Sequence, residues 1–205
     1  IGTIEVIDNF PYQALRDYYE KWYRPDQQGI VVVGDIDVDK VEAKIKEIFS
    51  PIEMPANAAE RVYEQVPDNK EPIITIAKDK EQPATMIYIW HKHPATPNEA
   101  KGQLSYLVQN YMLSMIESML TARLEELRQS AEPPFIMGVT EDTDFLLAKT
   151  TQAFAGIALS KDDGIPTALA ALVREIERAR KFGFTASEYA RAKADYLRSL
   201  ESAYN

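Results

Sequence analysis

Apolar residues recur at helical spacing near the start of the chain. From Pro11 to Tyr23 they lie three and four residues apart, which predicts a helix that stops before Pro25. The β-branched run Ile30 to Val33 is short and typical of a buried strand. Asp37 is placed to cap a second helix, whose apolar stripe comprises Val41, Ile45, Ile48 and Phe49. The pattern predicts helix, strand and helix in residues 1–50.

Residues 51–72 break this periodicity. They contain four prolines and scattered charges, and no helical or strand period persists through them. We therefore predict a linker over 51–72, which separates a first part, 1–50, from a second domain, 73–205.

The second domain has the pattern of a mixed fold. Its predicted elements are two strands, a long helix, two more strands and two closing helices, with the strands at 73–78, 85–91, 135–139 and 145–159 and the long helix at about 98–129. Pro166 suits the first turn of one closing helix, and Thr185 with Glu188 forms a capping box at the start of the other. This order predicts an α+β fold in which a largely antiparallel sheet packs against helices.

Composition narrows the possible chemistry. The 205 residues include 23 Lys and Arg against 32 Asp and Glu, and the net charge of −9 disfavours nucleic acid as a partner. Without cysteine there is no thiolate nucleophile and no Cys-based zinc or iron–sulfur site. No apolar run reaches the roughly 20 residues that span a bilayer, and no signal peptide is visible. A chain that begins with Ile1 and ends directly after a helical pattern suggests a piece of a longer protein.

Asp35 and Asp37 follow the predicted strand Ile30 to Val33 in an Asp-x-Asp pattern. Haloacid-dehalogenase-type phosphatases present a nucleophilic Asp and an acid/base Asp to Mg²⁺ and phosphate in this way, and Asp162-Asp163 would offer further ligands. The ordinary alternative is that Asp37 caps a helix and Asp35 occupies a turn. We favour this alternative and keep an Mg²⁺-dependent phosphatase as a less favoured hypothesis.

The two histidines of the chain, His91 and His93, share one face at the end of a predicted strand. That spacing suits a metal ion, but a third ligand would have to come from elsewhere in the fold. The alternative is two half-exposed strand-end side chains. Neither histidine belongs to a helical zinc-protease motif.

Three segments together resemble a known family. Leu15-Arg-Asp-Tyr-Tyr-Glu-Lys-Trp-Tyr-Arg-Pro-Asp26, Ile30-Val-Val-Val-Gly-Asp-Ile-Asp37 and Ile45-Lys-Glu-Ile-Phe49 are similar to the end of the first, catalytic-type domain of insulinase/pitrilysin-type zinc peptidases. From Pro72 onward the chain resembles the next, non-catalytic domain of that family, at 122–135 and again at 183–188. The resemblance covers essentially the whole chain.

This resemblance implies a role without catalytic residues. The family binds zinc through an inverted His-x-x-Glu-His helix whose Glu activates water, and residues 1–205 contain no such motif, so no catalytic or metal-binding residue transfers to this chain. Family members use an Arg, and a Tyr seven residues later, to bind peptide. Arg128 and Phe135 have this spacing, so they are the candidate substrate-binding residues, although Phe135 lacks the hydroxyl.

The resemblance further implies that the parent protein is a zinc metalloendopeptidase that encloses unfolded peptides in a chamber. This chain would supply chamber wall, would be inactive alone, and would have as partners peptide substrates, the zinc-bearing part and the second half of the parent. A bacterial periplasmic or envelope location is favoured over the cytoplasm. The alternative within the family is a non-enzymatic scaffold that binds peptides for an active partner.

Overall fold

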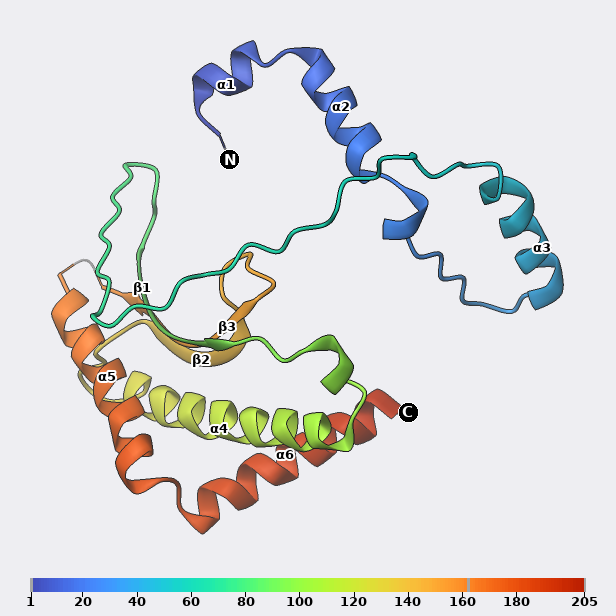
Figure 1. Cartoon of the computed structure of the whole chain (residues 1–205). Coiled ribbons are helices and arrows are strands. Elements are labelled where there is room, and N and C mark those ends of the chain that lie inside the picture. The colour runs from blue at the N-terminus through green and yellow to red at the C-terminus, as the bar shows by residue number, and fades with distance from the viewer. Residues whose placement is uncertain (1, 162, 205) are drawn as a thin grey trace. The chain divides into compact units, whose positions relative to one another are not determined.

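The computed structural model describes residues 2–161 and 163–204 of the chain (Figure 1). They form two compact units, Ile1–Val62 and Tyr63–Asn205. The division between Val62 and Tyr63 lies inside the segment 51–72. The assignment of 1–50 and 73–205 to two family domains stays a prediction.

The first unit consists of short helices joined by extended chain. These are α1 (Ile4–Asn9), α2 (Tyr12–Trp22), the 3₁₀ turn η1 (Pro25–Gln27) and α3 (Val38–Phe49). Asp37 caps α3, since its Oδ1 accepts a hydrogen bond of 3.2 Å from the Lys40 N–H. The two predicted helices and the Asp37 cap are therefore confirmed.

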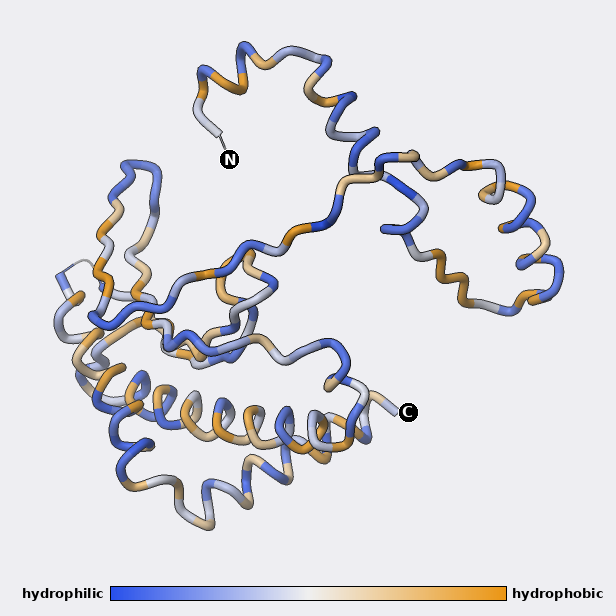
Figure 2. The backbone as a smooth tube through the Cα atoms, viewed as in Figure 1, coloured by the Kyte–Doolittle hydropathy of each residue, from blue (hydrophilic) through white to orange (hydrophobic). Residues whose placement is uncertain are grey.

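The predicted strand at Ile30 to Val33 is wrong for this structure. The segment is extended but pairs with no other strand in the described part of the chain, and Val31 and Val33 are 86% and 90% exposed. A strand needs a neighbour to satisfy its amides and carbonyls, and residues 2–62 offer none. Figure 2 shows the run as an apolar stretch between η1 and α3.

A single guanidinium organises the first unit. Arg24 is the one buried side chain among its described residues. Its Nε and Nη2 donate to the Asp26 carboxylate at 3.0 and 3.1 Å, and its Nη1 donates to the Ala59 carbonyl at 2.8 Å. These bonds hold the turn after α2 against the end of the unit, while the apolar side chains of α2 and α3 remain largely outside any core.

The second unit contains the sheet and the longer helices. Its elements are β1 (Thr85–Pro94), η2 (Asn98–Ala100), α4 (Leu104–Arg128), β2 (Met137–Asp144), β3 (Thr151–Ser160), α5 (Ile165–Phe182) and α6 (Ala186–Tyr204). The strands form a three-stranded antiparallel sheet in the order β1-β3-β2. This confirms the α+β class and the antiparallel sheet. The predicted strand at 73–78 is wrong, because those residues pair with no strand in the described chain.

The helices cover one face of the sheet, as Figure 1 shows for α4 and α5. Gly156 of β3 faces α5 so closely that a Cβ there would lie 2.8 Å from Ile176 Cδ1. Leu124 of α4, Leu172 of α5 and the Phe135 ring are fully buried in the core between the layers, which also includes Ala158, Ala168 and Ala171. Burial of these apolar side chains is the main favourable term that holds helices to sheet.

Helix α6 packs on α4 rather than on the sheet. Met115 and Met119 of α4 form a small core with Ala192 of α6. Tyr111 Oη lies 2.9 Å from Tyr189 Oη, and the Tyr111 and Tyr196 rings meet edge to face at 5.3 Å. The described unit therefore has three layers: the sheet, α4 with α5, and α6.

The close approach of β2 to the core predicts that Gly138 tolerates no larger residue. A Cβ at Gly138 would lie 2.9 Å from Phe135 Cε2 and 3.3 Å from Leu124 Cβ, and the buried ring has little room to move. We expect Gly138→Ala to lower the free energy of unfolding by about 1–3 kcal/mol. Urea unfolding followed by circular dichroism measures this change.

The matched control is Gly102→Ala, where no atom lies within 4 Å of the added Cβ. We expect its unfolding free energy to stay within about 0.5 kcal/mol of the wild type. Equal stability of the two variants would contradict the packing argument.

Candidate functional site

The face of the sheet opposite the helices carries a row of aromatic side chains. Because Gly156 points toward α5, its neighbour Ala155 points away, and so does Trp90, which pairs with Ala155 across the sheet. Tyr88 lies two residues earlier on the same face. The Tyr88 and Trp90 rings stack at 5.1 Å, and Trp90 meets the Phe145 ring edge to face at 5.7 Å.

These rings lie beside very small side chains. Ala153 and Ala155 of the central strand are buried, whereas Tyr88 and Trp90 are 47% and 41% exposed. The rings are thus partly exposed to solvent beside buried alanines, and exposed aromatic rings accept apolar groups and cations.

An extended segment of the same chain reaches one end of this face. Lys92, on the same face as Trp90, donates to the Pro67 carbonyl at 2.6 Å, and the Thr150 hydroxyl donates to the Glu64 carbonyl at 2.9 Å. Residues 64–67 are therefore bound through their backbone, without strand pairing. The contacts show that this end of the face holds extended polypeptide.

The candidate residues Arg128 and Phe135 have different surroundings. Arg128 ends α4 and is exposed, and its guanidinium binds the Glu125 carboxylate. Phe135 is fully buried in the core. Their part in substrate binding stays a prediction, and for Phe135 it would be an indirect one, through the position of the backbone around it.

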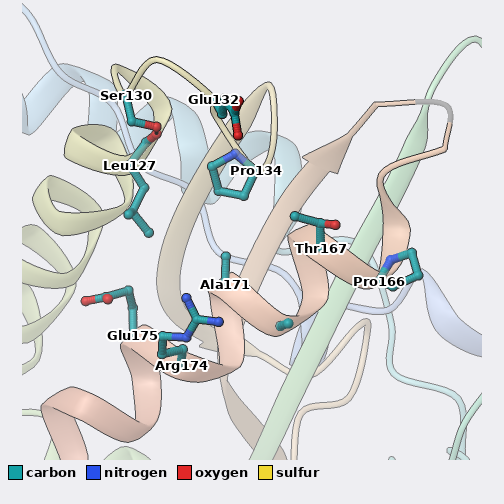
Figure 3. Close-up of a pocket in the computed structure, with 10 residues that line it drawn as sticks. Leu127, Ser130, Glu132, Pro134, Pro166, Thr167, Ala171, Arg174 and Glu175 are labelled. Carbon is teal, nitrogen blue, oxygen red and sulfur yellow. Dashed lines mark hydrogen bonds between the residues drawn. The ribbon is translucent and has the colours of Figure 1, made fainter.

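An open groove lies beside the end of α4. Its volume is about 530 Å³, and Figure 3 shows Leu127 and Ser130 from the α4 side facing Ala171, Arg174 and Glu175 of α5. Two of its lining residues, Leu127 and Ser130, are close to Arg128 in the sequence, but the groove lies on the helix side of the sheet. The groove and the aromatic face are therefore separate surfaces.

His93 is tied to the opposite edge strand. Its Nε2 lies 3.0 Å from Asp142 Oδ2, and its Nδ1 lies 3.1 Å from the Pro94 carbonyl oxygen. Nearby, the Glu117 carboxylate accepts the Asp142 N–H, and burial together with the charges of Asp142 and Glu141 raises the pKa of Glu117. His91 instead lies near Glu177, whose pKa it helps Arg180 to lower. Within the described residues, no three His, Asp or Glu side chains gather as a metal site.

The Asp-x-Asp pattern has a structural role at one of its positions. Asp37 caps α3, and its hydrogen bonds with Lys40 lower its pKa. Asp35 lies in a bend before that helix. Of the further pair, Asp162 falls outside the described residues. The arrangement matches the alternative in which Asp37 is a helix cap.

A buried ion pair fixes α6, and sequence reasoning identified only part of it. Arg123 of α4 donates to both carboxylate oxygens of Glu188, and its Nη2 also donates to the Gly183 carbonyl at 3.0 Å. Glu188 also accepts the Thr185 N–H at 2.6 Å, which confirms the capping box. The Arg123 hydrogen bond is the main reason why the pKa of Glu188 falls to about 2.

The sequence patterns did not predict the aromatic face, although one of them indicates part of it. Alternation in the strand 85–91 places Tyr88 and Trp90 on one face. Nothing local indicates that Ala155 and Glu141 share that face, since this depends on the register of three strands.

None of the described helices is long and apolar enough to cross a membrane.

Comparison with known proteins gives a consistent result. A family model described as the peptidase M16 inactive domain matches residues 9–196. The chain is 29% identical over 205 residues to the probable zinc protease PqqL of Escherichia coli strain K12, covering 99% of this chain and 21% of that protein. It is 26% identical over 140 residues to a zinc protease PQQL-like protein of Arabidopsis thaliana, covering 66% of this chain and 14% of that protein.

Solved structures agree. The crystal structure of the periplasmic protease PqqL from Escherichia coli matches with a TM-score of 0.72 and 26% identity, over 99% of this chain and 22% of that one. A protein described as a predicted insulinase family protease, from Yersinia pestis, is 19% identical and shares the fold with a TM-score of 0.70, over 94% of this chain and 41% of that one. The resemblance to insulinase-type zinc peptidases is confirmed, and the chain spans about a fifth of the length of the first curated relative.

The Arg123–Glu188 pair predicts an acid-sensitive contribution to stability. The pKa of Glu188 is lowered from 4.5 to about 2 in the folded chain, so the contribution is present above pH 4.5 and is lost as the pH falls toward 2. We expect Glu188→Gln to lower the unfolding free energy at pH 7 by about 2 kcal/mol, because Arg123 keeps its buried charge without a carboxylate. Urea unfolding between pH 2 and 7 measures both effects.

Glu125→Gln is the matched control. The pKa of Glu125 is also lowered to about 2, by Arg128, but this pair lies in solvent. We expect no measurable change in the unfolding midpoint at pH 7, because water and salt screen the pair. Equal destabilisation by the two substitutions would show that burial of the Arg123 pair is not what matters.

Proposed function

This chain belongs to the peptidase M16 inactive domain family, and we propose that it is the non-catalytic supporting part of a zinc-dependent metalloendopeptidase. It forms wall in the chamber where peptides are cleaved and helps to position them. The observation that carries the proposal is the two-sided sheet: helices seal one face, and the other presents Tyr88 and Trp90 to solvent.

The zinc chemistry belongs to another part of the parent protein. Neither histidine of this chain lies in an inverted His-x-x-Glu-His motif; His93 lies 3.0 Å from Asp142, whereas His91 is near Glu177. The relatives are zinc proteases by name, and this chain corresponds to about a fifth of the first of them. We expect the chain alone to be inactive, with zinc supplied by the missing part.

The first unit supports a docking role toward that missing part. Its run Ile30 to Val33 is apolar and extended, and Val31 and Val33 are almost fully exposed. Such a run becomes a stable strand once a neighbouring sheet accepts it. We assign residues 1–50 to the catalytic-type domain and expect Ile30 to Val33 to complete its sheet.

Arg128 is the substrate contact that we carry forward from the family resemblance. Its guanidinium is exposed and its partner Glu125 lies on the surface, so a peptide carbonyl or carboxylate can replace that partner at small cost. Phe135 sets the position of the chain after α4 and has no hydroxyl to polarise a carbonyl. We assign the parent to the bacterial periplasm, because the similar PqqL of Escherichia coli is a periplasmic protease.

A second candidate within the family is a non-enzymatic scaffold that binds peptides for an active partner. Phe135, where a substrate-binding Tyr would stand, favours it. The Asp-x-Asp phosphatase loses its support, because Asp37 serves as a helix cap.

Reconstitution tests the proposed function. We expect the purified chain to hydrolyse no peptide, and to yield hydrolysis that chelators abolish once it is mixed with the zinc-bearing part and the second half of its parent. Hydrolysis of equal rate without this chain would refute the supporting role. Peptide binding by the reassembled parent without hydrolysis would instead support the scaffold.

Val31→Asp sharpens the test of docking. Val31 is 86% exposed, so we expect the substitution to leave the unfolding midpoint of the isolated chain unchanged but to reduce reconstituted activity at least tenfold, because a charge would be buried in the completed sheet. Val38→Asp is the control, at a 67% exposed position that opens α3. Equal effects of both variants on reconstitution would contradict the assignment of Ile30 to Val33.

A further inference from the structure

The sheet face opposite the helices combines aromatic rings with an acidic side chain. Trp90 of β1 pairs with Ala155 of β3, and Ala155 pairs with Glu141 of β2, so all three side chains project from the same face in one row. Neighbouring strands lie about 4.8 Å apart, which places the backbones at Trp90 and Glu141 about 10 Å apart. Ala155 contributes only a methyl group between them.

The carboxylate of this row is available. Glu141 is exposed, and among the residues that the structure describes it forms no ion pair. The neighbouring acid Asp144 pairs with Lys149 at 3.3 Å, and Asp142 faces the other side of the sheet, toward His93. The row therefore has an exposed carboxylate without an ion-pair partner on one side and partly exposed aromatic rings on the other. The Lys92 ammonium of the same face is held by the Pro67 carbonyl.

The aromatic cluster already attracts a cation from its own chain. The Lys92 ammonium lies 5.9 Å from the centre of the Phe145 ring while it donates to the Pro67 carbonyl. That carbonyl belongs to the extended segment 64–67, which shows the kind of polypeptide that fits here. In this contact the cation belongs to β1, and the extended segment supplies the carbonyl that accepts its hydrogen bond.

We propose that this face binds an extended peptide through an Arg or Lys side chain, which packs on Trp90 and pairs with Glu141. The inference rests on the proposed function and names the class of substrate that the chamber wall holds. A guanidinium suits the site best, because its planar group packs against the exposed part of the indole while its N–H groups donate to the carboxylate. The large apolar side chains of the same peptide pack along Tyr88 and Phe145.

Charge selects this occupant over others. The net charge of −9 raises the local concentration of cationic peptides and repels acidic ones. Nucleic acid bases would also stack on the rings, but their phosphates would face the same repulsion. The occupant is therefore a basic, unfolded peptide.

Fluorescence anisotropy of labelled peptides, added to the whole 205-residue chain, tests the proposal. The probes are unstructured peptides of about 12 residues, made of Gly, Ser and one Leu, which differ only in one Arg, Gln or Glu next to the Leu. At about 20 mM salt we expect the Arg peptide to bind about tenfold more tightly than the Gln peptide, and the Glu peptide to bind weakest. Raising the salt to about 200 mM should shrink this preference.

Two substitutions locate the site. Glu141→Gln should reduce the preference for Arg over Gln about fivefold without changing the unfolding midpoint, because the side chain is exposed. Trp90→Leu should weaken both the Arg and the Gln peptide about fivefold to tenfold. Glu126→Gln is the control: it makes the same charge change at an exposed position on α4, behind the sheet, and should alter neither quantity.

The proposal is overturned if the wild-type chain binds no peptide, if it does not distinguish Arg from Gln, or if Glu141→Gln and Glu126→Gln behave alike. The supporting role is tested separately, by zinc-dependent hydrolysis in the reconstituted parent, and it does not depend on these binding results. The peptide-binding proposal is supported if Glu141→Gln loses the preference for the Arg peptide and Glu126→Gln keeps it.

Discussion

The small side chains of the central strand β3 are the constraint on which the second unit depends. On one face, Gly156 and Ala158 let α5 and the core side chains of α4 approach the backbone closely. On the other face, Ala153 and Ala155 leave room for the rings of β1 to lie beside the strand. A bulky residue at any of these positions would push one layer away from the sheet, because close-packed interiors absorb added volume only by moving backbone. The same strand therefore determines both the closed face and the open face.

The closed face also depends on how α6 is attached. Helix α6 buries apolar surface against α4, through Ala192 packed on Met115 and Met119. The Arg123–Glu188 pair fixes the start of α6 relative to α4, because the Glu188 carboxylate both caps α6 and binds the Arg123 guanidinium of α4. The Glu188 carboxylate thus accepts one N–H at the start of the helix and pairs with a buried cation, while the Thr185 hydroxyl accepts the Glu188 N–H. These contacts attach α6 to α4 behind the face that we assign to peptide.

The sequence predicted what local forces decide and failed where distant partners decide. The helices, the Asp37 cap and the Thr185–Glu188 box are local, and the structure contains them. The strands at 30–33 and 73–78 were predicted from apolar runs alone, yet a strand also needs a neighbour, and neither run pairs in the described chain. Likewise the row from Trp90 through Ala155 to Glu141 exists only through the register of two strand pairs. No spacing in the sequence encodes that register.

The first unit shows the same dependence on a larger scale. Among the residues of this unit that the structure describes, Arg24 is the one buried side chain. Its guanidinium donates to the Asp26 carboxylate and to the Ala59 carbonyl. A guanidinium network gives geometry but little net stability, whereas ordering each residue opposes folding by about 1–2 kcal/mol. The offsetting term has to be apolar burial, and the side chains able to supply it, such as Leu15, Val31 and Ile48, face solvent. Under the proposed function the zinc-bearing part covers them. The exposed apolar side chains of the first unit are then the ones that join this chain to the zinc-bearing part.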